Sequence, residues 1–568
     1  MRGARVLLAL VAALLLCGAA ASGAPAATAD IPDAVAPATR PPGFRTDAAQ
    51  ATAIARRAPA VADVLRARPD VDVFAVVVDQ HAWSIVFTDP VDGRTRAEVA
   101  VSARGAVGQA WTGVQASSPL TRDGLDPTFR KPWVWLPFAL LFVAPFVDPR
   151  RPRRLLHLDL AALLGFGASC VALDRGHGAA AILLFYPPLL YLLGRCVVAG
   201  LRPRPRGRLV PLLPTAVLAV GVLGLFGARV ALNVHSPQVM DIGVASVEGA
   251  DRILHREPLY VPGPGHGDTY GPLNYVAYTP FVAALGAGDP GLRAAHAATL
   301  AFDLLTLVGL LVLGLRLRAG PEGRRLGLAL AWACAACPFT LLGVMDNTND
   351  GLVAALLVWM LVALAAPVAR GALLGLATAA KFFPGALLLV VARGRVGGGR
   401  RAGPATAGAC LGVVAFAIAV YLPAGGQRTF GDCTLGYQLS RPPDLSAWTL
   451  LPPGTWLRPA TELGVVALVA ALSLWRGAPR TPGQVAGLAG AVAIALQLPA
   501  GHWFYFYIMW FAPLVLVAVL AEHGGERAAA AAVPQSWSAD SAAGAGAGSG
   551  SGGGADAAAS SRSARLAA

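Results

Sequence analysis

Long apolar runs separated by short arginine-rich segments fill most of the chain. From Pro132 to Leu520 these runs approach the ~20 residues that an α-helix needs to cross ~30 Å of hydrocarbon. We predict membrane spans near residues 133–147, 155–173, 178–199, 209–232, 293–315, 326–343, 351–367, 404–423, 460–475, 484–499 and 503–521. The pattern therefore predicts a polytopic α-helical membrane protein.

The first residues have a different pattern. Two arginines, an apolar run and a group of small residues predict a signal peptide or a retained anchor over residues 1–24. Residues 30–130 then combine a helical stretch with alternating runs that predict strands. The helix is expected over residues 47–68 and the strands over 71–78, 82–88 and 94–102. We expect a small extracytoplasmic α+β domain.

Composition and charge agree with a membrane location. Of the 568 residues, 55% are hydrophobic and only 14% are charged, which excludes an ordinary soluble enzyme. The net charge of +14 comes mainly from arginines clustered between the apolar runs. Such clusters are typical of the cytoplasmic loops of membrane proteins, so the basic charge does not indicate nucleic acid as a partner.

The arginine clusters also predict the topology. They lie at residues 150–154, 202–208 and 316–325, and the positive-inside rule requires them on one side of the membrane. Gly271–Gly286 therefore cannot be a full crossing, and we predict an interfacial or half-inserted helix there. The topology leaves two long outer loops, 233–270 and 424–459, and a disordered cytoplasmic tail over residues 527–568.

Gly371–Ala392 has arginines at both ends, which implies an even number of crossings. Pro384 interrupts the run, because proline breaks a helix. We predict two half-helices that meet near Lys381. A single kinked crossing is the alternative.

Two motifs in the outer part of the chain carry a resemblance. The first is Val239-Met-Asp241 followed by a helical stretch and Glu257-Pro-Leu-Tyr260, then Tyr270-Gly-Pro-Leu-Asn274. The second is Gly375-Leu-Ala-Thr-Ala-Ala-Lys-Phe-Phe-Pro384. Their order resembles the GT-C glycosyltransferases that use polyprenyl-phosphate sugars, and glycosyltransferase family 87 in particular. In the N-terminal region, Trp83-Ser-Ile-Val-Phe87 and Gly105-x-Val-x-x-x-Trp111 resemble PepSY-type domains.

The resemblance covers roughly residues 210–520. It implies a GT-C-like core over residues 209–522, with residues 132–208 as additional transmembrane helices. It also implies transfer of a hexose, mannose by analogy, from a polyprenyl-phosphate donor to a lipid or glycan acceptor. The reaction would take place on the outer face of the plasma membrane, with inversion at the sugar and Asp241 as the base.

Physical chemistry supports two of these residues. A carboxylate at the membrane surface can accept the proton of an acceptor hydroxyl, as expected for Asp241. A lysine within an apolar stretch is costly and therefore marks a functional site by default, so Lys381 is expected to bind the departing phosphate. The structural alternatives are a solvated or helix-capping Asp241 and a snorkelling Lys381.

Further substrate-binding candidates lie around the two outer loops. Arg441 can bind two phosphate oxygens at once, although a plain loop arginine is the alternative. His502, Tyr505 and Tyr507 can line the same cavity, or an interfacial aromatic belt from Trp503 to Trp510 explains them. Within the resemblance, Tyr260 and Tyr270 also count as substrate-binding.

The reaction requires no cofactor. Met345-Asp-Asn-Thr-Asn-Asp350 has two carboxylates that can bind a divalent cation, but two are too few to support one. A cap by Asn349 or Asp350 at the start of the next helix is the favoured interpretation. Two other functions stay open: a secondary transporter, which also uses broken helices, and a non-enzymatic membrane scaffold with an outer binding domain.

Overall fold

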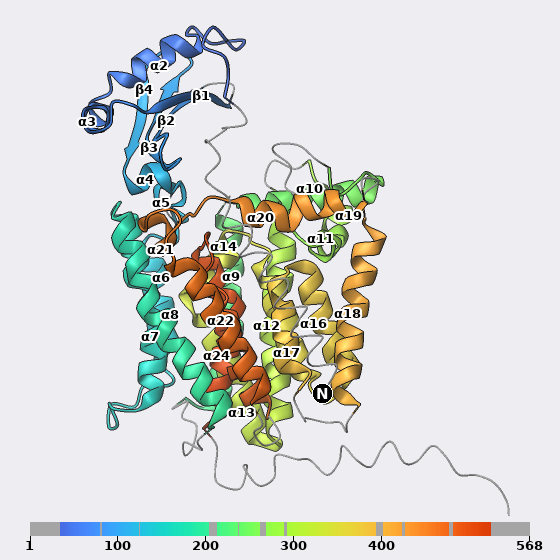
Figure 1. Ribbon diagram of the computed structural model, residues 1–568. Coiled ribbons are helices and arrows are strands. Elements are labelled where there is room, and N and C mark those ends of the chain that lie inside the picture. Colours follow the sequence, from blue (N-terminus) through green and yellow to red (C-terminus); the bar gives the residue numbers. More distant parts are fainter. Residues whose placement is uncertain are drawn as a thin grey trace, which may run out of the picture.

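The protein is a helical bundle with a small β-sheet domain at one end (Figure 1). The computed structural model describes residues 34–79, 82–123, 125–203, 213–236, 238–261, 269–288, 292–393, 401–422, 426–475 and 481–523. The predicted leader at residues 1–24 and the predicted tail at 527–568 lie outside these residues. We call the end of the bundle that carries the sheet the domain side.

The sheet domain is an antiparallel meander in the order β1-β2-β3-β4 with two helices before it. Its elements are α2 (Ala48–Arg56), α3 (Pro59–Ala67), β1 (Asp72–Asp79), β2 (Ala82–Thr88), β3 (Thr95–Ser102) and β4 (Val107–Thr112). The predicted single helix is divided in two, because Pro59 cannot continue α2 and instead starts α3. Trp83, Ile85 and Phe87 alternate along β2 and form the buried core with α2.

The first half of the bundle begins with two short helices that connect it to the sheet. Its elements are α4 (Val114–Ser117), α5 (Leu120–Asp123), α6 (Pro132–Val143), α7 (Leu155–Asp174), α8 (Gly178–Leu201), α9 (Thr215–His235), α10 (Asp241–His255), α11 (Pro272–Leu285), α12 (Arg293–Leu317), α13 (Gly320–Ala336) and α14 (Pro338–Met345).

The second half contains the hairpin around Lys381 and a run of short helices on the domain side. Its elements are α15 (Asp350–Val362), α16 (Pro367–Ala380), η1 (Phe383–Leu387), α17 (Leu388–Val391), α18 (Ala402–Val420), α19 (Gly426–Gly431), η2 (Asp432–Gly436), α20 (Tyr437–Ser440), α21 (Ala447–Leu450), α22 (Leu457–Leu474), α23 (Pro482–Ala495), η3 (Tyr505–Tyr507) and α24 (Ile508–Ala521).

Within the described residues, six helices are long and apolar enough to cross a membrane: α7, α8, α9, α12, α18 and α22. The α13–α14 pair raises the number to seven if it counts as one span. These helices support the prediction of an integral membrane protein. The span predicted at residues 326–343 falls on the α13–α14 pair, in which the chain bends by 59° where Pro338 begins a new helix.

The segment around Lys381 is a broken hairpin, as predicted. Helix α16 ends at Ala380, Lys381 has an extended backbone with φ −138° and ψ 135°, and the chain then turns back through η1 and α17. Helix α11 has 14 residues, a rise of ~21 Å, so it is too short for a full crossing. This agrees with the prediction for Gly271–Gly286.

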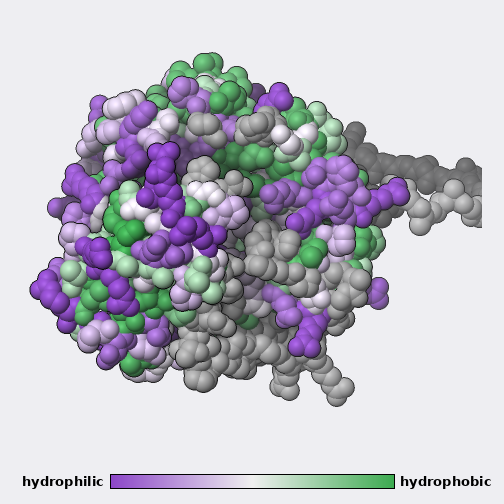
Figure 2. Space-filling view, turned by 90° about the horizontal axis from the view of Figure 1, so that it is seen from above, coloured by the Kyte–Doolittle hydropathy of each residue, from purple (hydrophilic) through white to green (hydrophobic). Residues whose placement is uncertain are grey.

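The sheet domain is attached to the bundle by hydrogen bonds. The Asp444 carboxylate accepts from the Ser118 hydroxyl and, at 3.3 Å, from the Leu120 backbone N–H. Arg94 donates to the Trp448 carbonyl oxygen at 3.2 Å. The loop after α20 therefore connects the sheet domain with the bundle. Seen from the domain side, hydrophilic residues cover much of the sheet domain at the left (Figure 2).

Candidate functional site

Lys381 forms a buried ion pair with Asp350 at the start of α15. Trp510 Nε1 donates to the same Asp350 oxygen at 2.6 Å. The Lys381 ammonium also lies 5.4 Å from the ring centre of Tyr270 and 5.2 Å from that of Trp510. The predicted anionic partner of Lys381 is thus a carboxylate of the protein itself, because a buried ammonium is stable only beside a fixed negative charge.

The turn before α15 does not cap the helix as predicted. Asn349 has helical backbone angles and its side chain makes no cap hydrogen bond. Its Nδ2 donates instead to Asn274 Oδ1 at 2.8 Å, and Asp350 faces Lys381. Among the described residues no group of three metal-binding side chains exists. The Asp350 carboxylate is already neutralised by the lysine, so it is a poor cation ligand.

Two glycines bring the outer segments against this ion pair. The Gly271 N–H donates to the Ala380 carbonyl oxygen at 3.1 Å, and a Cβ at Gly271 would collide with the Ala379 carbonyl. A Cβ at Gly243 would lie 2.5 Å from the Asn347 carbonyl oxygen. Only glycine permits such close backbone approach, so both glycines fix the loops that carry Asp241 and Tyr270.

Asp241 is the first residue of α10 and its side chain is exposed. Its Oδ1 accepts from the Ile242 N–H at 2.7 Å, and the N-cap position belongs to Met240. Burial raises the pKa of Tyr270 well above its usual value, and the charges of Asp241 and Asp350 raise it further. Tyr270 therefore lies close to both Asp241 and the Lys381–Asp350 pair.

Tyr260 supports Tyr270. The Tyr260 ring is fully buried against Tyr275 and Phe430, and its hydroxyl donates to the Tyr270 carbonyl oxygen at 2.8 Å. The Tyr270 N–H donates to the Tyr275 hydroxyl at 3.1 Å. The prediction that Tyr260 binds substrate is not supported, since this ring holds the loop from inside.

Arg441 and His502 form a second polar pair on the domain side. Arg441 Nη2 lies 3.4 Å from His502 Nε2, and its guanidinium lies 5.4 Å from the ring centre of Tyr437. Burial, and then the charge of Arg441, lower the pKa of His502 to about 3. The neutral imidazole can therefore accept from Arg441. The Arg441 charge also reaches Tyr507, as do those of Asp241 and Asp350.

Tyr505 belongs to the core. Its buried hydroxyl lies 2.6 Å from Ser169 Oγ on α7, and its ring packs edge-on against Trp503. Tyr507 lies near the charged groups instead and stacks on Trp510 at 4.1 Å. In the 3₁₀ turn of η3, side chains two positions apart point in different directions, so Tyr505 faces the core while Tyr507 faces the charged groups.

We define the candidate site as the group that these contacts and charge interactions join: Asp241, Tyr270, Asp350, Lys381, Arg441, His502, Tyr507 and Trp510. Sequence reasoning placed Asp350 at a helix cap and Trp510 in an aromatic belt. The signal that pointed to Asp350 was the requirement of Lys381 for a negative partner.

Two neighbouring buried oxygens, one in the site and one next to it, lack hydrogen-bond donors. Asn349 Oδ1 and Asp350 Oδ2 have no partner in the part of the chain that the structure describes. Leaving a buried acceptor without a donor costs about 1–3 kcal/mol. Both oxygens are therefore suited to accept from a ligand that carries several hydroxyl groups.

Asp346 lies in the turn that contacts Met240, the residue before Asp241, and its buried carboxyl allows this turn to be tested. Its carboxyl is buried with Oδ1 unpaired, and its backbone oxygen accepts from the Met240 N–H at 3.0 Å. Burial, and then the charge of Asp126, raise the pKa of Asp346 well above its ordinary value of 3.8. The folded state thus keeps a proton that the unfolded state releases, and stability falls as the pH rises from 3.8 through the higher native pKa.

Asp346→Asn is expected to stabilise the protein by about 1–3 kcal/mol at pH 7 and to flatten this pH dependence, because a neutral amide replaces a carboxyl that must take up a proton when it is buried. Thermal melting in detergent between pH 4 and 8 measures both effects. Asp72→Asn, an exposed residue of β1, is the matched control and should follow the parent protein. An Asp346→Asn variant that is less stable at pH 7 would contradict the assignment.

The sequence matches no protein-family model and no curated protein significantly. The inference of a function therefore rests mainly on the geometry of the candidate site.

Proposed function

We propose that the protein is an inverting membrane glycosyltransferase that moves a hexose from a polyprenyl-phosphate donor to an acceptor hydroxyl. The observation that carries this proposal is the position of Asp241. The exposed carboxylate of Asp241 and the buried Lys381–Asp350 pair both lie close to Tyr270 at one end of the bundle. This arrangement provides a general base, Asp241, next to a polar site whose ion pair is buried.

In the proposed reaction, Asp241 accepts the proton of the acceptor hydroxyl while that oxygen attacks the anomeric carbon of the sugar. The bond between the anomeric carbon and the phosphate oxygen breaks, and the lipid phosphate leaves with the bonding electrons. Arg441 is the better cation for this phosphate, because Lys381 is already neutralised by Asp350. The role of Lys381 then becomes the positioning of Tyr270 and Asp350.

The unpaired oxygens of Asn349 and Asp350 support a sugar as the substrate. A hexose offers several hydroxyl donors, and each donor that reaches a buried acceptor removes an energetic penalty. The identity of the hexose as mannose, and of the acceptor as a lipid or a glycan, rests on the family resemblance alone.

The arginine-rich connections support an outward-facing site. The connection from α6 to α7 and the one from α12 to α13 lie at the end of the bundle opposite the sheet domain (Figure 1). The positive-inside rule assigns that end to the cytoplasm and the domain side, with Asp241, to the outer face of the plasma membrane.

A donor assay in proteoliposomes tests the function. Purified protein is mixed with a radiolabelled polyprenyl-phosphate hexose and a membrane glycolipid extract, and in parallel with the corresponding nucleotide sugar. We expect transfer from the lipid donor only, without added metal. Transfer from the nucleotide sugar, or movement of a solute across the membrane without transfer, would contradict the proposal and favour another enzyme class or a transporter.

A further inference from the structure

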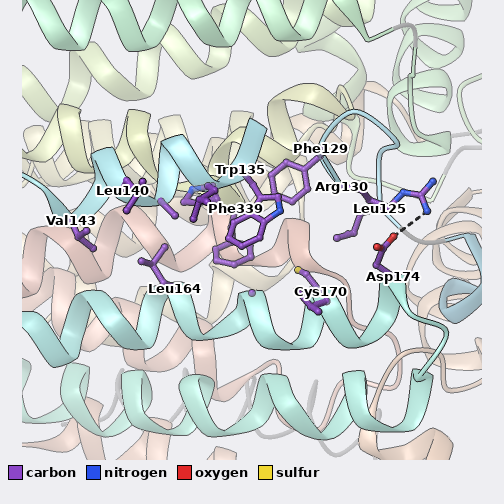
Figure 3. Close-up of a pocket in the computed structure, with 15 residues that line it drawn as sticks. Leu125, Phe129, Arg130, Trp135, Leu140, Val143, Leu164, Cys170, Asp174 and Phe339 are labelled. Carbon is purple, nitrogen blue, oxygen red and sulfur yellow. Dashed lines mark hydrogen bonds and ion pairs between the residues drawn. The ribbon is translucent and has the colours of Figure 1, made fainter. Parts of the chain in front are cut away.

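A groove of about 300 Å³ runs along the bundle between α6, α7 and the start of α14 (Figure 3). Most of it lies on α6 and α7, which precede the proposed glycosyltransferase core, and it lies away from the candidate site (Figure 1). Its walls are mainly aromatic and aliphatic, and they include Leu125, Phe129, Trp135, Leu140, Leu164 and Phe339. Its two charged residues are Arg130 and Asp174.

The groove is polar at one end only. Arg130 and Asp174 lie at one end in Figure 3, and Val143 and Leu164 lie at the other. Asp174 is the last residue of α7, and the ~10 residues back to Leu164 rise ~15 Å. This length is half of the ~30 Å hydrocarbon layer, so the groove extends from the level of the lipid headgroups to about the bilayer centre.

The groove is open toward the membrane. Two of its lining side chains, Leu136 and Leu140, are 44% and 59% exposed on the surface of the bundle. In a bilayer this surface faces hydrocarbon, so a lipid chain is the ligand with direct access to the groove. A water-soluble ligand would have to displace lipid first.

Positive charge is in excess at the polar end. Arg130 Nη1 donates to Asp174 at 3.1 Å, and both side chains of this pair are about 40% exposed. Lys131 and Arg175 follow in the sequence next to these residues and are also exposed. A half-exposed ion pair contributes only about 0–1 kcal/mol, so Arg130 can exchange Asp174 for a phosphate at little cost.

We propose that this groove binds one chain of an anionic phospholipid, with the phosphodiester on Arg130. The groove provides the depth of one leaflet for the chain, and the excess of cations selects a negative headgroup over a zwitterionic one. This site is separate from the candidate site, and its occupation does not depend on glycosyl transfer.

Substitutions at two glycines test whether the groove binds a lipid chain. At Gly167, which lines the groove, an added Cβ meets no atom within 4 Å, so Gly167→Leu fills the groove without a backbone clash. Gly194 on α8 is equally free of contacts but does not line the groove, which makes Gly194→Leu the matched control. Native mass spectrometry in phosphatidylglycerol and phosphatidylcholine mixtures counts the bound lipids.

We expect the parent protein and Gly194→Leu to retain one phosphatidylglycerol, and Gly167→Leu to retain it about tenfold less. Arg130→Gln should reduce the preference for phosphatidylglycerol over phosphatidylcholine by about tenfold, because a charge-assisted contact is lost. Arg104→Gln, an exposed arginine of the sheet domain, should leave the preference unchanged.

Equal retention by Gly167→Leu and Gly194→Leu, or equal binding of the two lipids by the parent protein, would overturn the proposal. Retention of an added polyprenyl phosphate in place of phosphatidylglycerol would overturn the assignment of the ligand. None of these results depends on whether the donor assay shows transfer.

Discussion

Replacing Asp350 by alanine is expected to destabilise the protein by about 3–5 kcal/mol, because it leaves the Lys381 ammonium buried without a fixed negative charge. It also removes the acceptor of the Trp510 indole N–H. Thermal melting and unfolding in mixed detergent measure the loss. Asp174→Ala breaks a half-exposed pair of the same bundle and should cost less than about 1 kcal/mol.

A double substitution separates the effect of an unpaired charge from the effect of lost side-chain volume. Lys381→Met together with Asp350→Leu removes both charges at similar volume, and such replacements are often neutral or stabilising. We expect the double variant to recover most of the stability that Asp350→Ala loses. If Asp350→Ala were as stable as the parent, the buried ion pair would not contribute as described. If the double variant stayed as unstable as Asp350→Ala, the loss would come from packing or from the unpaired Trp510 indole N–H, and not from charge.

The Lys381–Asp350 ion pair changes the result expected for the Lys381→Ala substitution. Sequence alone predicts that Lys381→Ala abolishes transfer while expression stays intact, because it treats the lysine as a phosphate ligand. The structure predicts that expression falls as well, since Asp350 then loses its partner. Folding and transfer measured together for Lys381→Ala distinguish the two: transfer is lost with the fold intact if the ammonium contacts the phosphate, and both are lost if Lys381 holds Asp350 in place.

Much of the bundle could be predicted from hydropathy, because each membrane-crossing helix has to be apolar over its whole length. The broken hairpin was also predictable, since Pro384 and the flanking arginines are local signals. The bend at Pro338 also has a proline as its local signal, but no arginines flank it and the apolar run continues through it. Short, fully buried helices such as α15 and α23 have the same composition as crossing helices, so their ends were predicted too far out.

The candidate site was predictable only where a residue is unusual in its own segment. Lys381 and Asp241 are such residues, because charge next to an apolar run is costly and therefore noticeable. The contact between Lys381 and Asp350 depends on how α15 packs against α16, and 31 positions separate the two residues. The choice between Tyr505 and Tyr507 depends on a single 3₁₀ turn, which sequence patterns do not specify.

The sheet domain is connected to the site through one loop. Arg441 precedes Asp444 by three positions, and Asp444 accepts from Ser118 and Leu120 of the segment that follows the sheet. The segment that follows the sheet therefore contacts the bundle three positions from the proposed phosphate ligand.

Asp241→Asn is expected to lower transfer from the polyprenyl-phosphate donor by about 10²–10⁴-fold, the usual contribution of a positioned general base. Asparagine keeps the size of the side chain and can no longer accept the proton of the acceptor hydroxyl. Because Asp241 is exposed at the start of α10, stability should change by less than about 0.5 kcal/mol. Initial rates and melting curves of the same preparation measure the two quantities.

The control lies on the same helix. Asp251 and Glu248 are also acidic residues of α10, but they lie two to three helical turns further on, so Asp251→Asn and Glu248→Gln should keep nearly full activity. If one of these controls lost activity and Asp241→Asn did not, the base would be misassigned within α10. If all three kept activity, a carboxylate outside α10 would have to take the proton. Asp350 is then the next to test, because its Oδ2 is buried without a donor and its ion pair with Lys381 already holds a negative charge close to Tyr270.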